Sequence, residues 1–227
     1  MTRSDPDLLN LQRDGARIYP GACLSILDHL HGALTDHDLG LPGSRIQGAG
    51  PLAALLEGSL SLGLILRELD VADYKPVRAV LFDKNPDANW SLGWHQDRTI
   101  CVQTRHEVAG FGPWSIKQGL IHVEPPFSLI ERMVTMRLHL DAVGDDNAPL
   151  LIAPGSHRRG RIAHDQIESV VAECGTYPCL AAAGDIWVYS TPIVHASARS
   201  VSPARRRVLQ IDFSGDSLPE PLSWSGV

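Results

Sequence analysis

Two residues of different chemistry, His95 and Asp97, stand two positions apart in a segment predicted as a β-strand, Gly93–Val102. Side chains alternate between the two faces of a strand, so the imidazole and the carboxylate are expected to point the same way. Together they can hold one divalent metal. A histidine from another strand would complete a 2-His-1-carboxylate facial triad, which is typical of non-haem iron(II) oxygenases.

His195 is the candidate for the second histidine, and it lies in the apolar strand predicted at Ile193–Ser197. A His-x-Asp pair alone is common by chance. A lone histidine on an apolar strand is also more often a core residue than a ligand. The assignment of His195 therefore depends on the residues that follow it.

Arg206 and Ser197 supply that further argument. Arg206 begins the last predicted strand, eleven residues after His195. An arginine that points into a barrel must find an anion, because an unpaired buried charge is costly. A dicarboxylate such as 2-oxoglutarate would offer a planar carboxylate to the guanidinium, and Ser197 could donate its hydroxyl to the same group. The alternative is a solvated basic turn, because Arg205 and Arg207 flank Arg206.

The rest of the chain must supply the strands that carry these residues. Turn signals divide the sequence after about Lys75 into short strand candidates, with one helix at His164–Glu173. The strand candidates are Val77–Phe82, Gly93–Val102, Gly119–Val123, Met133–Leu140, Leu150–Ile152, Asp185–Tyr189, Ile193–Ser197 and Arg206–Phe213. This pattern predicts a mainly β fold with flanking helices, either a sandwich or a barrel-like jelly roll.

The first 74 residues have a helical character. Apolar stripes at helical spacing run through Cys23–Leu34 and Pro51–Leu69, with Gly63 as a candidate break, and Pro6–Arg13 predicts a short helical turn. The segment His37–Gly50 is predicted as a loop. We therefore expect one domain over residues 1–227, with a helical support region at residues 1–74 and a β-core at residues 75–227.

Composition argues against several classes of function. The net charge is −6 and the basic residues form no long run, so we expect no nucleic-acid partner and no membrane partner. No apolar stretch reaches the roughly 20 residues that span a bilayer, and no signal peptide is visible. The four cysteines match no zinc or redox motif. We expect a cytoplasmic protein with free thiols. Its oligomeric state stays open.

A long polar segment, Gln103–Gln118, is the candidate lid, although a simple surface excursion fits it equally well. Five residues in or beside this segment are candidates to line a substrate pocket: Arg98, His106, Trp114, Lys117 and His122. The cationic groups favour an acidic small-molecule substrate, but solvated surface charge explains them as well.

Several motifs in a consistent order resemble the phytanoyl-CoA dioxygenase family of iron(II)/2-oxoglutarate oxygenases. They are Trp94–Asp97, Leu140-Asp141, Asn147–Leu150, Pro154–Arg158, Gly184-Asp185, His195–Ser197 and Arg206. The motifs run through most of the chain after Val77, whereas the N-terminal third matches only in general character. The family often has glycine where this chain has Ala148 and Ala196.

The resemblance implies a double-stranded β-helix, a cupin-like jelly roll with the metal near one open end. It implies that His95, Asp97 and His195 are the catalytic iron(II) ligands, and that Arg206 and Ser197 bind the distal carboxylate of 2-oxoglutarate. The implied reaction is hydroxylation of a C–H bond of a small molecule, with release of succinate and carbon dioxide. Related halogenases replace the carboxylate ligand by a small residue, and Asp97 is present here.

Two alternatives remain at this stage. One is a cupin-like metal enzyme that does not use 2-oxoglutarate, in which Arg206 would have no clear purpose. The other is a jelly-roll protein that binds a ligand without catalysis, against which the intact triad speaks.

Overall fold

Two antiparallel sheets that face each other form the scaffold of the protein. The computed structural model describes residues 9–35, 37, 43–48, 50–201 and 204–227. The larger sheet has six strands, in the order β1 (Ala16–Tyr19), β11 (Ile186–Ser190), β8 (Val134–His139), β13 (Arg206–Ser214), β3 (Lys75–Lys84) and β2 (Ser44–Ile46). The smaller sheet has four, in the order β10 (Tyr177–Cys179), β9 (Leu150–Ile152), β12 (His195–Ser197) and β4 (Leu92–His95).

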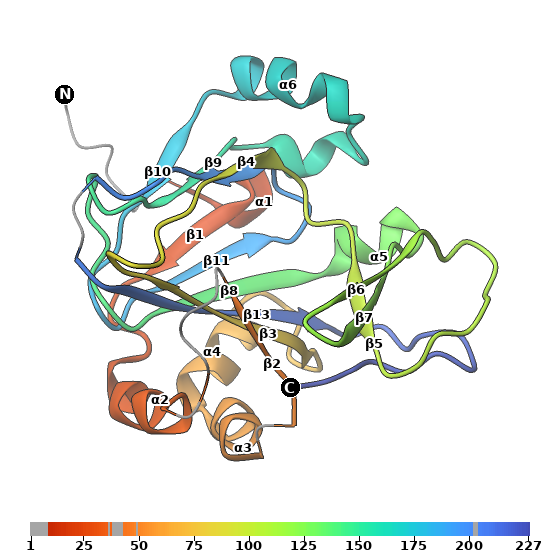
Figure 1. Cartoon of the computed structure of the whole chain (residues 1–227), viewed down its shortest axis with the longest axis horizontal. Helices are drawn as coiled ribbons and strands as arrows, with labels where there is room; N and C mark the ends of the chain where they lie inside the picture. The colour runs from red at the N-terminus through yellow and green to blue at the C-terminus, as the bar shows by residue number, and fades with distance from the viewer. Residues whose placement is uncertain (1–8, 36, 38–42, 49, 202–203) are drawn as a thin grey trace.

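A third sheet and several short helices complete the fold (Figure 1). The third sheet has three strands, in the order β5 (Ile100–Val102), β7 (Leu120–Val123) and β6 (Trp114–Lys117). The α-helices are α1 (Leu11–Asp14), α2 (Leu27–Ala33), α3 (Gly50–Gly58), α4 (Leu60–Glu68), α5 (Phe127–Arg132) and α6 (Ile167–Cys174). Short 3₁₀ turns lie at Leu24–Ile26, Ser156–Arg159 and His164–Gln166.

The helices α2, α3 and α4 cover the outer face of the six-stranded sheet, as Figure 1 shows. Their buried apolar residues pack with alternate residues of the strands, among them Leu81, Met136, Leu138, Leu209 and Ile211. Because successive strand residues point to opposite faces, the residues between these point into the space between the two sheets. We call this second face the interior face. It carries most of the buried charge described below.

The turn into β11 explains the Gly184-Asp185 motif. Gly184 has a φ of +90°, and a Cβ there would lie 2.4 Å from a methyl carbon of Leu24. The Asp185 carboxylate accepts hydrogen bonds from the backbone N–H groups of Gly21, at 2.8 Å, and Ala182, at 2.7 Å. Only glycine fits the backbone at this point, and the aspartate that follows closes the turn.

The helix predicted at Pro51–Leu69 is two helices. It breaks at Ser59 rather than at Gly63, because the Ser59 hydroxyl accepts from the backbone N–H of Leu62 and begins α4 as an N-cap. No single helix in the described ranges is long and apolar enough to cross a membrane. Only α3 and α4 taken together, bent by 55°, reach that length and composition.

The N-terminal region also supplies strands, which sequence periodicity did not predict. β1 and β2 lie at the two edges of the six-stranded sheet and are only four and three residues long. Strands this short carry too few alternations to be recognised. The loop predicted at His37–Gly50 contains β2, and the predicted loop Gln103–Gln118 contains β6. The start of the predicted turn Pro6–Arg13, and positions 38–42 and 49, lie outside the described residues.

Candidate metal centre

The pairing of β12 with β4 places the two candidate histidines next to each other. His195 and His95 are register partners in this antiparallel pair, so their side chains leave the same face of the sheet. The centroids of the two imidazole rings are 4.3 Å apart. Register between strands, which local sequence does not encode, thus brings together two histidines that are far apart in the chain.

Both imidazoles are oriented by the same kind of backbone contact. Nδ1 of His95 lies 2.8 Å from the carbonyl oxygen of Gly93, and Nδ1 of His195 lies 2.9 Å from that of Ile193. A proton on each Nδ1 makes these contacts hydrogen bonds and leaves the Nε2 lone pairs free, as metal binding requires. Burial, and then the neighbouring His95, lower the pKa of His195 to about 4, so its ring is neutral at pH 7.

Asp97 joins the histidines from outside the strand. β4 ends at His95, so the strand predicted over Gly93–Val102 is wrong in its middle, where the chain is irregular before β5. The ligand atoms of His95, Asp97 and His195 nevertheless all lie within 4.8 Å of one another. The structure brings together the three residues that the sequence analysis selected, but alternation along one continuous strand is not what gathers them.

Arg78 on β3 sets the charge and orientation of Asp97. Its Nη2 donates to Oδ2 of Asp97 at 3.3 Å, and its Nε donates to Asp212. Burial alone would raise the pKa of Asp97, but the charge of Arg78 is the largest of the neighbouring influences that outweigh burial and hold this pKa well below its usual value. The carboxylate therefore stays ionised, as a metal ligand must be.

At one end of the interior face, the buried cation Arg78 has carboxylate partners within the chain. Arg78 and Asp212 are register partners across β3 and β13. Thr135, opposite Asp212 on β8, donates its hydroxyl to Oδ1 of Asp212 at 2.9 Å. One guanidinium therefore forms ion pairs with two carboxylates, Asp97 and Asp212. All of these partners belong to the chain itself.

The opposite end of the same two strands carries two buried cations, Arg206 and Lys84. They are register partners on β13 and β3, and only 2% and 1% of their surfaces are exposed. Arg206 donates through Nη1 to the carbonyl of Ala148, and Nζ of Lys84 donates to Oγ of Ser197 at 3.1 Å. Among the residues that the structure describes, neither cation forms an ion pair.

The pKa values of Lys84 and Arg206 are both lowered, because burial and neighbouring cations disfavour their charged forms. Burial, and then Arg206 and Arg137, lower the pKa of Lys84 to about 7. Burial, and then Arg137, lower the pKa of Arg206 to about 9. Nε of Arg206 and both ring nitrogens of the buried His139 have no hydrogen-bond partner in the described part of the chain. Buried polar atoms without a partner are rare, so this end has the character of an anion-binding site.

Three of the predicted substrate residues make their contacts elsewhere. Arg98 donates to the carbonyl of Ile162. Trp114 packs into the apolar cluster on the far face of the three-stranded sheet, the face opposite His122. His122 is fully buried, with Nε2 3.0 Å from Sγ of Cys101. These contacts give each residue a place in the packing, and none of them is made with the metal cluster.

His157 and Asn89 also find local partners. The ring of His157 fills the space beside Gly15, with Nε2 3.3 Å from the carbonyl of Gln12. Asn89 exchanges two hydrogen bonds with the backbone of Ser200, at 2.9 and 2.8 Å. His157 is therefore part of a turn, while His139 lies beside Arg137 and Arg206, whose charges act on it.

Sequence analysis did not select Arg78, although it predicted a strand over Val77–Phe82. The alternation within this run was the available signal, because Arg78, Val80 and Phe82 share one face of the strand. Only the pairing of β3 with β13 shows that this face is the interior one.

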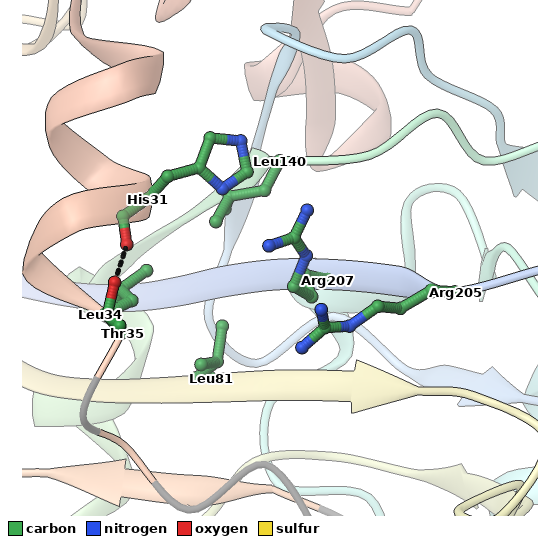
Figure 2. Close-up of a pocket in the computed structure, with 7 residues that line it drawn as sticks. All are labelled: His31, Leu34, Thr35, Leu81, Leu140, Arg205 and Arg207. Carbon is green, nitrogen blue, oxygen red and sulfur yellow. Dashed lines mark hydrogen bonds between the residues drawn. The ribbon is translucent and has the colours of Figure 1, made fainter.

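A separate cavity of about 210 Å³ lies on the outer, helix-covered side of the six-stranded sheet. Figure 2 shows the residues that line it: His31, Leu34, Thr35, Leu81, Leu140, Arg205 and Arg207. Both arginines are paired, with Asp83 at 2.9 Å and with Asp141 at 2.8 Å. The sheet separates this cavity from the metal cluster, and its charges are already satisfied.

The fold and the cluster define a class, the metal-dependent oxygenases built on a double-stranded β-helix. A family model described as phytanoyl-CoA dioxygenase (PhyH) matches residues 66–208. The chain belongs to this family, and it is an oxygenase that depends on iron(II) and 2-oxoglutarate. The fold class and the family resemblance predicted from sequence are confirmed. A search of curated protein sequences finds no match.

Solved structures with the same fold include enzymes of bacterial origin. EctD from S. alaskensis, in its apo form, gives a TM-score of 0.67 at 16% identity, over 97% of this chain and 82% of that chain. HygX from Streptomyces hygroscopicus, with nickel, 2-oxoglutarate and hygromycin B bound, gives 0.60 at 13% identity, over 92% and 86%. AviO1 from Streptomyces viridochromogenes Tue57 gives 0.61 at 20% identity, over 92% and 93%. At these identities the likeness is one of fold.

Proposed function

We propose that His95, Asp97 and His195 hold the catalytic iron(II) and that the enzyme hydroxylates a C–H bond of a small molecule. The observation that carries the proposal is the set of three ligand atoms within 4.8 Å of one another. Two imidazoles and one ionised carboxylate suit ferrous iron and leave further coordination positions open. The presence of the carboxylate ligand favours hydroxylation over halogenation.

The Arg206 end suits the distal carboxylate of 2-oxoglutarate. The guanidinium of Arg206 offers its unpartnered Nε, and the hydroxyl of Ser197 and the ammonium of Lys84 lie in contact beside it. A planar guanidinium and a neighbouring hydroxyl match the geometry of a carboxylate. A dianionic co-substrate would also balance charges that the described residues leave unbalanced.

The residues of the chain divide the remaining work. When bound, iron(II) and 2-oxoglutarate supply the oxidation of the C–H bond by dioxygen, with release of succinate and carbon dioxide. The carbonyls of Gly93 and Ile193 keep protons on Nδ1 of the two histidines, so both Nε2 atoms stay free. Arg78 keeps Asp97 ionised and holds one of its oxygens. The burial of Lys84 and Arg206 would limit the access of water to a co-substrate carboxylate held there.

Measurement of succinate tests this proposal. The purified protein, supplied with iron(II), 2-oxoglutarate and oxygen under reducing conditions, is expected to form succinate slowly without substrate and faster with one. Omission of iron, and exclusion of oxygen, are the controls. A wild-type protein that neither binds 2-oxoglutarate nor forms succinate under any of these conditions would contradict the proposal.

A further inference from the structure

Two more cations lie on the Asp97 side of the metal cluster, Arg45 on β2 and Lys117 on β6. Arg45 is the register partner of Val80 on β3, and Val80 shares the interior face with Arg78. The side chain of Arg45 therefore leaves the interior face, next to the cation that holds Asp97. Neither Arg45 nor Lys117 takes part in the functions proposed above.

Lys117 reaches the same region from a different sheet. Ser115 and His122 are register partners in the three-stranded sheet, so Lys117, two residues after Ser115, shares their face. This is the face opposite the apolar cluster that contains Trp114. The turn after Lys117 is tied to the segment of Arg45. Gln118 accepts from the backbone N–H of Arg45 at 2.9 Å through its side-chain oxygen.

The charges of both residues act on the metal cluster. Burial, and then Arg78, lower the pKa of Arg45, while Asp97 acts to raise it. Burial, and then Arg45 and Arg78, lower the pKa of Lys117, and Asp97 again opposes the shift. These directions agree with the placement that the strand register and the Gln118–Arg45 hydrogen bond give to the two cations.

Neither cation has a partner that explains it. In the described residues, no ion pair and no side-chain hydrogen bond is formed by Arg45 or Lys117, and Nε of Arg45 is buried without an acceptor. The nearby carboxylates, Asp97 and Asp212, are already paired with Arg78. A bound metal would add further positive charge. Lys117 is exposed and water can solvate its charge, whereas Nε of the half-buried Arg45 lacks an acceptor that a bound anion would supply.

We propose that Arg45 and Lys117 bind an anionic group of the substrate, a carboxylate or a phosphate, and hold it beside the metal cluster. The inference rests on the proposed function and adds the class of substrate, a small molecule with at least one oxyanion. A guanidinium beside an ammonium provides a directional fork and a point charge, which together suit such a group. The Arg206 end, at the other end of β3, is left to the co-substrate.

A binding experiment with matched ligands tests the proposal. The probes are small carboxylic acids and phosphate monoesters, each paired with its neutral amide or alcohol. The protein is loaded with nickel(II) in place of iron(II), and with 2-oxoglutarate, so that binding is measured without turnover. Dissociation constants are compared for the wild type, the double variant Arg45→Gln/Lys117→Gln, and the control Arg105→Gln. Arg105 is an exposed cation that pairs with Glu107 and stacks on Trp114, on the far face of the same sheet.

We expect at least one acid to bind the wild type tenfold or more tightly than its neutral counterpart. The double variant should lose this preference and Arg105→Gln should keep it. The thermal midpoint of the double variant should be unchanged or higher, because the two cations repel each other and have no partner to lose. A purely structural role would lower it.

Two results would overturn the proposal. One is a wild-type enzyme with no preference for any acid, or a preference that survives in the double variant. The other is a double variant in which the concentration of 2-oxoglutarate required rises tenfold or more. Arg45 and Lys117 would then hold the co-substrate rather than the substrate. Failure of the wild type to bind 2-oxoglutarate would instead count against the proposed function, and the acid preference can be measured with the metal alone.

Discussion

The two ends of the β3–β13 pair carry buried arginines in contrasting surroundings. Arg78 meets two carboxylates of the same chain, Asp97 and Asp212. Arg206 donates to a backbone carbonyl, has Lys84 as its register partner, and meets no carboxylate in the described ranges. Both side chains are nearly inaccessible, with exposed fractions of 9% and 2%. The first charge has its partners within the chain, whereas the second has no carboxylate partner among the described residues, and we propose that a ligand supplies one.

This contrast gives a criterion for separating structural charge from functional charge. A buried cation with carboxylate partners stabilises the arrangement it belongs to, and removing it leaves unpaired anions behind. A buried cation without partners lowers the stability of the empty protein and gains its partner only on binding. Substitutions that remove the charge at the Arg78 end or at the Arg206 end should therefore have different effects.

The metal ligands should show the largest effect. Substitution of His95, Asp97 or His195 by alanine is expected to abolish iron binding and succinate formation, because two ligands cannot replace the triad. Iron content after anaerobic loading and desalting is the measurement. Full iron occupancy in any of the three variants would contradict the assignment of that residue.

Arg78→Met should destabilise the protein strongly. It leaves the carboxylates of Asp97 and Asp212 buried without a cation, a change that typically costs about 3–5 kcal/mol. The free energy of unfolding in urea measures it. The exposed pair Arg132–Asp216 provides the control, since Arg132→Met should change stability little. Equal losses of unfolding free energy in Arg78→Met and Arg132→Met would show that the Arg78 ion pairs do not stabilise the protein as the account requires.

Unlike Arg78→Met, Arg206→Met should weaken co-substrate binding without destabilising the protein. The empty protein is expected to be as stable as the wild type or more so, and the requirement for 2-oxoglutarate to rise roughly 100-fold, or about 2.8 kcal/mol. Iron binding should be retained. The neighbouring Arg205, which pairs with Asp83, is the matched control, and Arg205→Met should leave the requirement unchanged. If Arg206→Met binds 2-oxoglutarate normally, another residue holds the co-substrate.

Lys84 should make both stability and binding depend on pH. Its pKa is about 7 in the folded protein against 10.5 for an ordinary lysine. Between these values the unfolded chain binds more protons, so the stability of the empty protein rises with pH by up to about 1.4 kcal/mol per unit. A bound dianion favours the protonated amine, so affinity for 2-oxoglutarate should fall above pH 7. Lys84→Met should flatten both profiles, and identical profiles in the variant would rule Lys84 out as their cause.

The smallest effect is expected at Ala148, whose carbonyl accepts from Arg206. Ala148 has a φ of 51°, in the left-handed region that favours glycine. Ala148→Gly should relieve this strain and raise the melting temperature slightly, by the equivalent of about 1 kcal/mol or less. A decrease would show that the alanine methyl contributes packing that outweighs the strain.

Sequence alone predicted the fold class and the residues of the cluster, because these rest on local patterns and on a set of ordered motifs. Alternation placed Arg206, Gln210 and Asp212 on one face of β13, and their cross-strand partners share that face in the structure. Alternation fixes which residues share a face, but it does not decide which face is the interior.

Properties that depend on pairing between distant segments could not be predicted. The register that sets His195 against His95, and Asp212 against Arg78, is a property of the assembled sheets. The end of β4 at His95 is also set by tertiary contacts, which is why Asp97 was placed in a strand. Arg78 was missed for the same reason, since its value to the site lies in two partners far along the chain.

The most direct test of the account is a crystal structure of the protein loaded anaerobically with iron(II) and 2-oxoglutarate, with iron located by anomalous scattering. The account predicts iron bounded by His95, Asp97 and His195, and the distal carboxylate of 2-oxoglutarate on Arg206, with the Arg78–Asp212 pair undisturbed. Iron bound at a different set of residues, or a co-substrate carboxylate that leaves Arg206 unpaired, would contradict it.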